Sequence, residues 1–148
     1  MINVFISDFI TRLRSWVDLR NSIKDSTLEN QCIEIDKFWQ FAPIVNHYLH
    51  TDFIHEWPDP WQLISDNTYC YYARALGMIY TLLLLGIKDI DLVDAIDNNS
   101  NDVVLVLVDN AKYIMNYWPD TVVNNCLQDF KINKRHNLTH IITKIGIK

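Results

Sequence analysis

One apolar stretch constrains the fold of this chain more than any other segment. Nearly every residue between Tyr69 and Leu85 is apolar, aromatic or small, and Gly86 follows where a glycine commonly ends a helix. This pattern predicts a long core helix over 69–85. Cys70 opens the helix, where unpaired N–H groups and the positive end of the helix dipole favour a thiolate. The sequence therefore predicts a buried helix with a thiol at its first turn.

Size and cysteine content indicate one domain. The chain has 148 residues, of which 49% are hydrophobic and 12% aromatic, and such a chain is long enough to bury a core. Its three cysteines, Cys32, Cys70 and Cys126, are far apart and odd in number, which favours free thiols in a reducing compartment. We expect one domain over 1–148, with a helical part at 1–50.

Charge and the length of the apolar runs argue against two kinds of partner. The net charge is −5 and no Lys/Arg run is long enough to follow a phosphate backbone, so we expect no nucleic-acid partner. Lys131, Lys134 and Arg135 are expected to form a solvated face. The apolar run at 78–87 is too short to cross a bilayer, and the N-terminus, which contains Asp8, is not a signal peptide. We expect no membrane partner and an intracellular, cytoplasmic protein.

The N-terminal half is predicted to be helical. Apolar residues recur at spacings of three and four over 1–24, which predicts an amphipathic helix. The break Asp25-Ser26-Thr27 supplies capping residues, and a second helix is predicted over 31–50, kinked or divided at Pro43. A short helical turn at 59–64 has an N-cap aspartate followed by a proline.

The hydrophobic period changes after the core helix and predicts strands. The predicted strands cover 89–96, 103–108, 112–116 and 140–147. The run 103–108 is β-branched and leucine-rich, as in a central strand, and Asp109-Asn110 marks a hairpin turn. Residues 117–137 are predicted to form a loop with a short helix near 122–130. Helices followed by an antiparallel sheet indicate an α+β fold.

No metal or cofactor site is predicted. His47 and His50 are three residues apart, and His136 and His140 are four apart, so each pair could share a helix face. Neither pair has a cysteine or carboxylate at ligand spacing, which favours surface or capping roles. We therefore expect no bound metal and no cofactor.

The residues around Cys70 follow the order found in one group of thiol enzymes. A Trp/Pro lead-in at 57–61 precedes Cys70, the apolar helix ends in Leu85-Gly86-Ile87, and the strand 103–108 runs through a hairpin into 112–116. This layout, over roughly 57–120, resembles the transglutaminase-like superfamily, whose core is shared with papain-type cysteine peptidases. The resemblance implies a transglutaminase-like core at 51–148, with Cys70 as the nucleophile position.

The resemblance assigns two partners to this thiol, and neither position has the usual residue. Asp102 stands where the family has its histidine, and Asn116 stands where an acid usually orients the imidazole. Without an imidazole, no group takes the thiol proton and returns it to a leaving group. A neighbouring carboxylate also disfavours a thiolate. We interpret Cys70, Asp102 and Asn116 as the positions of a vestigial, inactive triad.

Two alternatives stay open from the sequence. His55, His136 or His140 could approach Cys70 through the fold and replace the missing base. Cys70 could instead be a small apolar residue packed at the start of a core helix, as buried free cysteines commonly are.

Aromatic residues gather around the lead-in, either as core or as a partner-binding surface. Tyr71 and Tyr72 are adjacent on a helix and cannot face the same side, so at least one is expected to meet solvent or a partner. Tryptophan and tyrosine are common interface hot spots. The candidate interaction residues are Trp57, Trp61, Tyr71 and Tyr72, together with Phe9 and Trp16 of the N-terminal helix.

Two functions follow from these patterns. The first is a non-catalytic structural or protein-interaction subunit on a degenerate transglutaminase-like scaffold, whose partners are other protein subunits in a larger assembly. A composition rich in Asn, Ile, Lys and Asp but with only three glycines and four prolines suggests a phage virion or tail component, located in the virion. The alternative is an active cysteine hydrolase or acyltransferase that uses Cys70 with a non-standard base.

Overall fold

The computed structural model describes residues 3–45, 49, 51–117, 122–124 and 126–145. The helices are α1 (Phe9–Ile23), α2 (Leu28–Gln40), α3 (Pro60–Asp66), α4 (Tyr71–Leu84) and α5 (Thr139–Ile145). The strands are β1 (Ile90–Ile96), β2 (Asp102–Val108), β3 (Tyr113–Met115), β4 (Val123–Asn124) and β5 (Lys131–Arg135). Short 3₁₀ segments are η1 (Val4–Ile6), η2 (Thr51–Glu56) and η3 (Leu127–Asp129).

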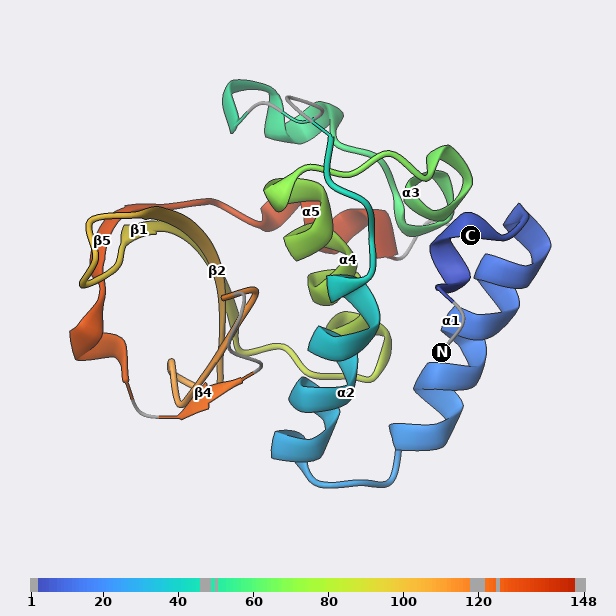
Figure 1. Cartoon of the computed structure of the whole chain (residues 1–148), viewed down its shortest axis with the longest axis horizontal. Coiled ribbons are helices and arrows are strands. Elements are labelled where there is room, and N and C mark those ends of the chain that lie inside the picture. The colour runs from blue at the N-terminus through green and yellow to red at the C-terminus, as the bar shows by residue number, and fades with distance from the viewer. Residues whose placement is uncertain (1–2, 46–48, 50, 118–121, 125, 146–148) are drawn as a thin grey trace.

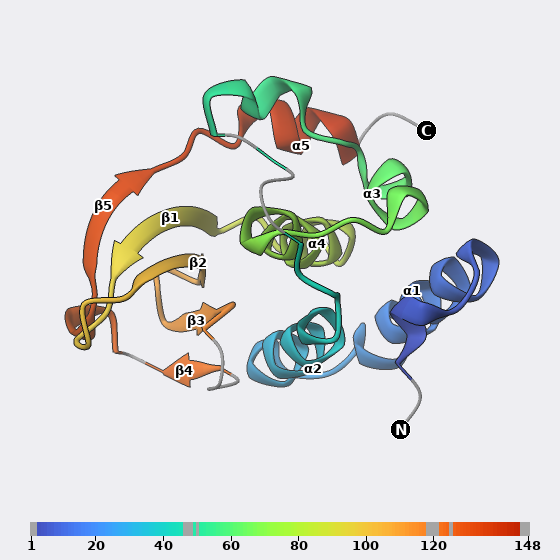
Figure 2. The ribbon, with the colours of Figure 1, turned by 45° about the horizontal axis from the view of Figure 1, so that its top comes forward.

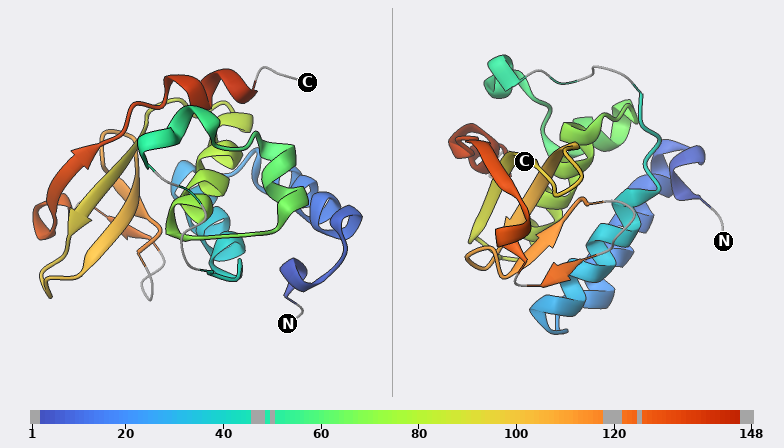
Figure 3. Two further views of the ribbon diagram at one scale, coloured as in Figure 1. Left: turned by 90° about the horizontal axis from the view of Figure 1, so that it is seen from above. Right: turned by 60° about the vertical axis from the view of Figure 1, so that its left-hand side comes forward.

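The fold is α+β, as predicted. The strands form one antiparallel sheet in the order β4-β3-β2-β1-β5. Helices α4 and α2 pack against the sheet, and α1 lies beyond them on the far side (Figures 1 and 2). Helix α5 packs on α4 and η2 near one end of the molecule (Figure 3).

Side-chain caps set where the helices begin. The carboxylate of Asp8 accepts the N–H of Thr11 at the start of α1, and the hydroxyl of Thr27 caps α2. Asp59 caps α3 directly before Pro60, so the predicted short helical turn is confirmed. Gly86 has φ +88 after α4, where a side chain would strain the backbone, and the predicted glycine end is confirmed.

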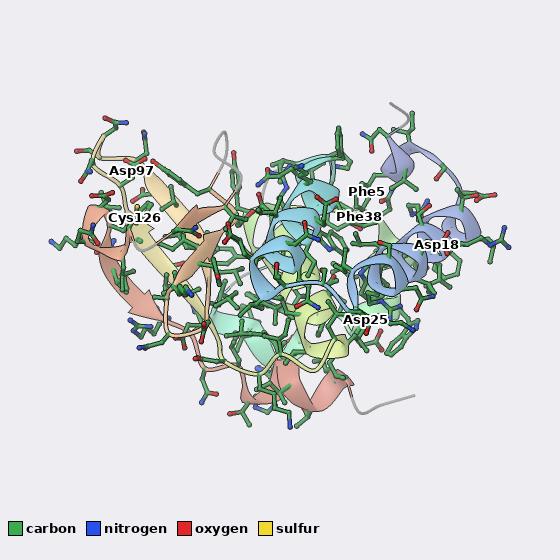
Figure 4. All side chains as sticks on the ribbon, turned by 90° about the horizontal axis from the view of Figure 1, so that it is seen from below. Phe5, Asp18, Asp25, Phe38, Asp97 and Cys126 are labelled. Atoms are coloured by element: carbon green, nitrogen blue, oxygen red, sulfur yellow. The ribbon has the colours of Figure 1, made fainter. Side chains whose placement is uncertain are left out.

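The C-terminal half of α4 is joined to α1 and α2 by one buried polar cluster. The hydroxyl of Thr81 accepts hydrogen bonds from the indole N–H groups of Trp16 (2.8 Å) and Trp39 (3.0 Å), and it donates to the carbonyl of Gly77 (2.7 Å). The ring of Trp39 lies so close to Gly77 that an added Cβ would sit 2.6 Å from it. Figure 4 shows Phe5 and Phe38 in the same aromatic region, with Asp97 and Cys126 at the opposite end of the molecule.

The two faces of the sheet pack against different parts of the chain. Alternate residues of β2, such as Val106 and Val108, belong to the main core beneath the helices. The intervening residues, such as Leu105 and Leu107, form a second, smaller core with Tyr117 and with side chains from the segment 127–132. Asp102 therefore lies on the helix-facing side of β2, because it is in register with Val106 and Val108.

Two predicted helices are shorter than expected. The first begins only at Phe9, because Asp8 caps it and η1 forms a separate turn before it. The second ends at Gln40, well short of residue 50. Pro43 disfavours helical backbone in the residue before it and cannot donate its own N–H, which ends the helix rather than kinking it.

Two predictions for the C-terminal part are wrong. The segment 140–147, predicted as a strand, overlaps α5, whose core residues Ile141 and Ile145 follow Leu138 at helical spacing. The segment 117–137, predicted as a loop, contains strand β5 on the edge of the sheet beside β1. Most residues of β5 are charged or polar, so the hydrophobicity pattern did not indicate a strand there. Charged side chains are nevertheless common on edge strands.

Candidate functional site

A groove opens where the N-terminal end of α4 meets β2. It consists of two adjoining hollows of about 500 and about 580 Å³. Ile44, Tyr71 and the β2 segment 102–104 line both hollows, so the two form one continuous feature. Cys70 and Asp102 line the larger hollow, and Asp102 and Asn116 line the smaller one. The groove therefore brings together the three positions that the sequence resemblance assigned.

Cys70 is the N-cap of α4. Its sulfur accepts the N–H of Ala73 at 3.4 Å, and its side chain is 8% exposed. The preceding residue, Tyr69, forms a parallel β-bridge with Ile44. The carbonyl of Tyr69 accepts a hydrogen bond from the N–H of Val45. This pairing anchors the chain just before the helix, so the thiol has a fixed position at the groove.

Asp102 is exposed, on the helix-facing side of β2 at its first residue. Asp94 lines the same hollow from β1, where it accepts the hydroxyl of Tyr72 at 2.7 Å. Burial, and then this hydrogen bond to Asp94, raise the pKa of Tyr72, so the phenol is a donor at neutral pH. The polar side chains that line the hollow with Cys70 are thus two carboxylates, the phenols of Tyr71 and Tyr72, and the amide of Asn133.

The polar groups of Asn116 form hydrogen bonds that link β2, α4 and α2. Its side-chain amide donates to the carbonyls of Val104 (2.8 Å) and Tyr71 (3.3 Å), which ties β2 to the first turn of α4. Its backbone N–H donates to Asp36 at 2.8 Å. Both amide hydrogens are therefore committed to main-chain carbonyls, which is a structural role.

A buried acid and a buried base support this end of the groove, and the sequence analysis missed both. Asp36 on α2 is fully buried, and burial raises its pKa to about 6 although the Asn116 N–H and the Arg74 charge act in the opposite direction. Arg74, the single charge in α4, donates to the backbone carbonyls of Gln40 (3.1 Å) and Ala42 (2.7 Å). That isolated charge within an apolar helix was the signal that could have identified it.

The turn between β1 and β2 borders the smaller hollow. The carboxylate of Asp97 accepts the backbone N–H groups of Asn99 and Asn101, both at 2.9 Å, and the hydroxyl of Tyr117 at 2.9 Å. These bonds, led by the one from Asn101, lower the pKa of Asp97. Its charge is thus already engaged within its own turn.

Among the described residues, no histidine lines the thiol's hollow. The side chain of His136 is buried, with Nε2 at 3.1 Å from Asp94 but not aligned for a hydrogen bond, and its ring stands edge-on to Tyr72 at 5.8 Å. His55 and His140 lie beside each other, with ring centroids 6.1 Å apart. The predicted pair His47 and His50 falls outside the described residues.

The predicted interaction residues divide between core and surface. Trp16 and Trp57 are buried in the main core, so the prediction that they lie on a surface is wrong. The helical period of α1 was correct, but it places Trp16 on the inward side. Phe9, Trp61 and Tyr72 are partly buried, whereas Tyr71 is 56% exposed at the groove. The expectation that one of the two adjacent tyrosines meets solvent is confirmed.

Comparisons with known proteins do not assign this chain to a family. Neither the protein-family models nor the curated proteins provide a match. Among the described residues, no helix combines the length and apolar character needed to cross a membrane. The same part of the chain holds no cluster of three His, Cys, Asp or Glu side chains arranged to bind a metal ion.

Proposed function

We propose that this protein is a non-catalytic protein-binding subunit, which holds a partner in the groove beside Cys70. One observation carries the proposal: the described side chains around the thiol include the carboxylates of Asp94 and Asp102 but no imidazole. A thiol enzyme needs a group that accepts the thiol proton and returns it to the leaving group. No described side chain that lines the hollow of Cys70 is an imidazole that could do both.

The use of the remaining polar groups supports the same proposal. The sulfur of Cys70 caps α4, and both side-chain amide hydrogens of Asn116 bond to backbone carbonyls. These hydrogen bonds give both residues structural roles at the start of α4. The arrangement thus supports a scaffold that resembles the transglutaminase-like superfamily but has lost its chemistry.

The groove suits part of another protein chain. The larger hollow, about 580 Å³, has mostly apolar walls with a few polar groups, as binding sites commonly do, whereas polar and charged side chains make up most of the lining of the smaller one, about 500 Å³. The exposed Tyr71 lies between them and is of a residue type enriched in interface hot spots. We propose that the partner is another subunit of an assembly, such as a phage virion or tail, and that the protein is found in the virion or the cytoplasm.

One contact favours a second candidate, a cysteine hydrolase or acyltransferase. His136 lies 3.1 Å from Asp94, and its ring contacts Tyr72, two residues after Cys70. A histidine–aspartate pair near a thiol is the arrangement that a non-standard base would need. The buried position of His136 argues against it, because the imidazole is outside the hollow that contains the thiol.

Turnover assays on matched variants separate the two candidates. We expect the wild type to hydrolyse p-nitrophenyl acetate, and to release ammonia from glutamine peptides, no faster than Cys70→Ser. Cys126→Ser is the control, since that cysteine lies outside the groove. The proposal is contradicted if turnover is lost in Cys70→Ser but kept in Cys126→Ser, and a loss in His136→Ala as well would identify the base.

A further inference from the structure

The first half of β2 has a described strand on only one side. β1 pairs with the whole of β2, but β3 pairs only with the segment Val106–Val108. The chain leaves the sheet at Asn116, whose φ of +68 is incompatible with an extended strand. Residues 102–105 therefore form an open edge along the groove as far as the structure describes the chain.

The backbone groups along this edge point toward the groove. The carbonyl of Val104 accepts the side-chain amide of Asn116, so it is directed away from β1. In an antiparallel sheet one residue directs its N–H and C=O to the same neighbouring strand, and residues two apart share that direction. Val104 and Asp102 thus present main-chain hydrogen-bonding groups to whatever lies in the groove. The Asn116 amide occupies one of the positions where a paired strand would donate.

The free charge beside this edge is negative. Asp102 is exposed, and none of the described side chains forms an ion pair or hydrogen bond with it. Arg74 also lines the groove, but its terminal nitrogens bond to Gln40 and Ala42. A partner that lies along β2 therefore meets an uncompensated carboxylate at Asp102, while the carboxylate of Asp94 already accepts the hydroxyl of Tyr72.

We propose that an extended segment of the partner protein adds to the sheet along Asp102–Val104 and places an arginine or lysine against Asp102. Strand addition of this kind takes its affinity from main-chain hydrogen bonds and its specificity from pockets for alternate side chains. The apolar walls at Ile44 and Tyr71 receive the neighbouring side chains. This inference rests on the proposed function and names the chemistry of the partner.

The charge requirement is tested by panning a random dodecapeptide library against the full chain, Asp102→Lys and the control Asp89→Lys. Asp89 is also exposed, but it directly precedes β1, whereas Asp102 pairs with Ile96 at the opposite end of that strand. Peptides enriched on the wild type should carry Arg or Lys and bind Asp102→Lys at least about tenfold more weakly, a loss of about 1.4 kcal/mol, while Asp89→Lys binds normally. The proposal is overturned if no peptide is enriched, if basic residues are not selected, or if both variants bind alike.

Amide hydrogen exchange of the ¹⁵N-labelled chain tests the strand pairing. An enriched peptide should slow exchange at Val104 in the wild type. Protection confined to residues outside 102–105 overturns strand addition. The two proposals fail separately, because turnover that requires Cys70 would contradict the non-catalytic function and leave the Val104 result intact. Absence of peptide binding without turnover would overturn only this inference.

Discussion

The two ends of α4 differ in how their polar groups are satisfied. Around Thr81, deep in the helix, one hydroxyl serves two indole N–H groups and one carbonyl, with Trp39 packed against Gly77. Around Cys70, at the start of the helix, the sulfur is a weak cap and Tyr71 is exposed. The same helix therefore has one end enclosed by the core and one end open at the groove.

Buried polar atoms without a partner show the same difference. Among the described residues there are five such atoms, and three belong to Asp36, Arg74 and His136, which surround the open end. Unpaired buried polar atoms reduce stability. The comparison teaches that the polar groups of the Thr81 cluster are paired, whereas those near the open end are paired incompletely, so changes at Thr81 should cost more stability.

Thr81→Val should produce the largest loss of stability, because valine keeps the shape but leaves the N–H groups of Trp16 and Trp39 without their acceptor. We expect the free energy of unfolding to fall by about 2–6 kcal/mol in urea denaturation, at 1–3 kcal/mol for each unsatisfied donor. Thr143→Val on the exposed side of α5 is the control, with an expected change within about 0.5 kcal/mol. Equal effects at the two threonines would remove the contrast between the ends of α4.

Asn116→Gly tests how much the side chain of Asn116 stabilises the open end of α4. Glycine tolerates the φ of +68 but removes the two amide hydrogen bonds, so we expect a loss of about 1–3 kcal/mol. Asn110→Gly is a matched control, since Asn110 also has a positive φ but lies in an exposed hairpin. Asn116→Ala should cost more than Asn116→Gly because alanine adds backbone strain. If both glycine variants unfold alike, Asn116 does not tie β2 to α4.

Among these residues, Asp36 should make the smallest and most pH-dependent contribution to the free energy of unfolding. Its native pKa, raised by burial to about 6, lies above the ordinary value of 3.8, so folding favours the protonated acid. This stabilisation is complete below about pH 4 and is lost as the pH rises through about 6. Relative to the wild type, Asp36→Asn should therefore gain up to about 1–3 kcal/mol between about pH 4 and about pH 7 in parallel urea titrations. A difference between the two chains that does not change with pH would contradict this account.

The sequence predicted what depends on local patterns. The apolar run of α4, the Asp59–Pro60 start of α3 and the β-branched run of β2 each carry a strong local signal, and all three elements are present. The β5 strand was missed because Ile132 is its one apolar residue and it depends on pairing with β1. The segment of α5 was predicted as a strand because isoleucine and threonine, which are β-branched, make up most of it, and its packing against α4 overrides that preference.

The site was predicted in part for the same reason. The order of elements brought Cys70, Asp102 and Asn116 to one groove, which depends on topology that the residue pattern encodes. The committed hydrogen bonds of Asn116 and the burial of Asp36 depend on side chains from elements distant in sequence. No local pattern contains that information.

Alkylation of Cys70 tests the central claim most directly. The full-length native chain is treated with iodoacetamide at neutral pH, and the modification of each cysteine is followed by mass spectrometry. We predict that Cys70 reacts more slowly than the partly exposed Cys126 in the same molecule and that unfolding removes the difference. Faster reaction at Cys70 than at Cys126, abolished by His136→Ala, would show an activated nucleophile and contradict the account.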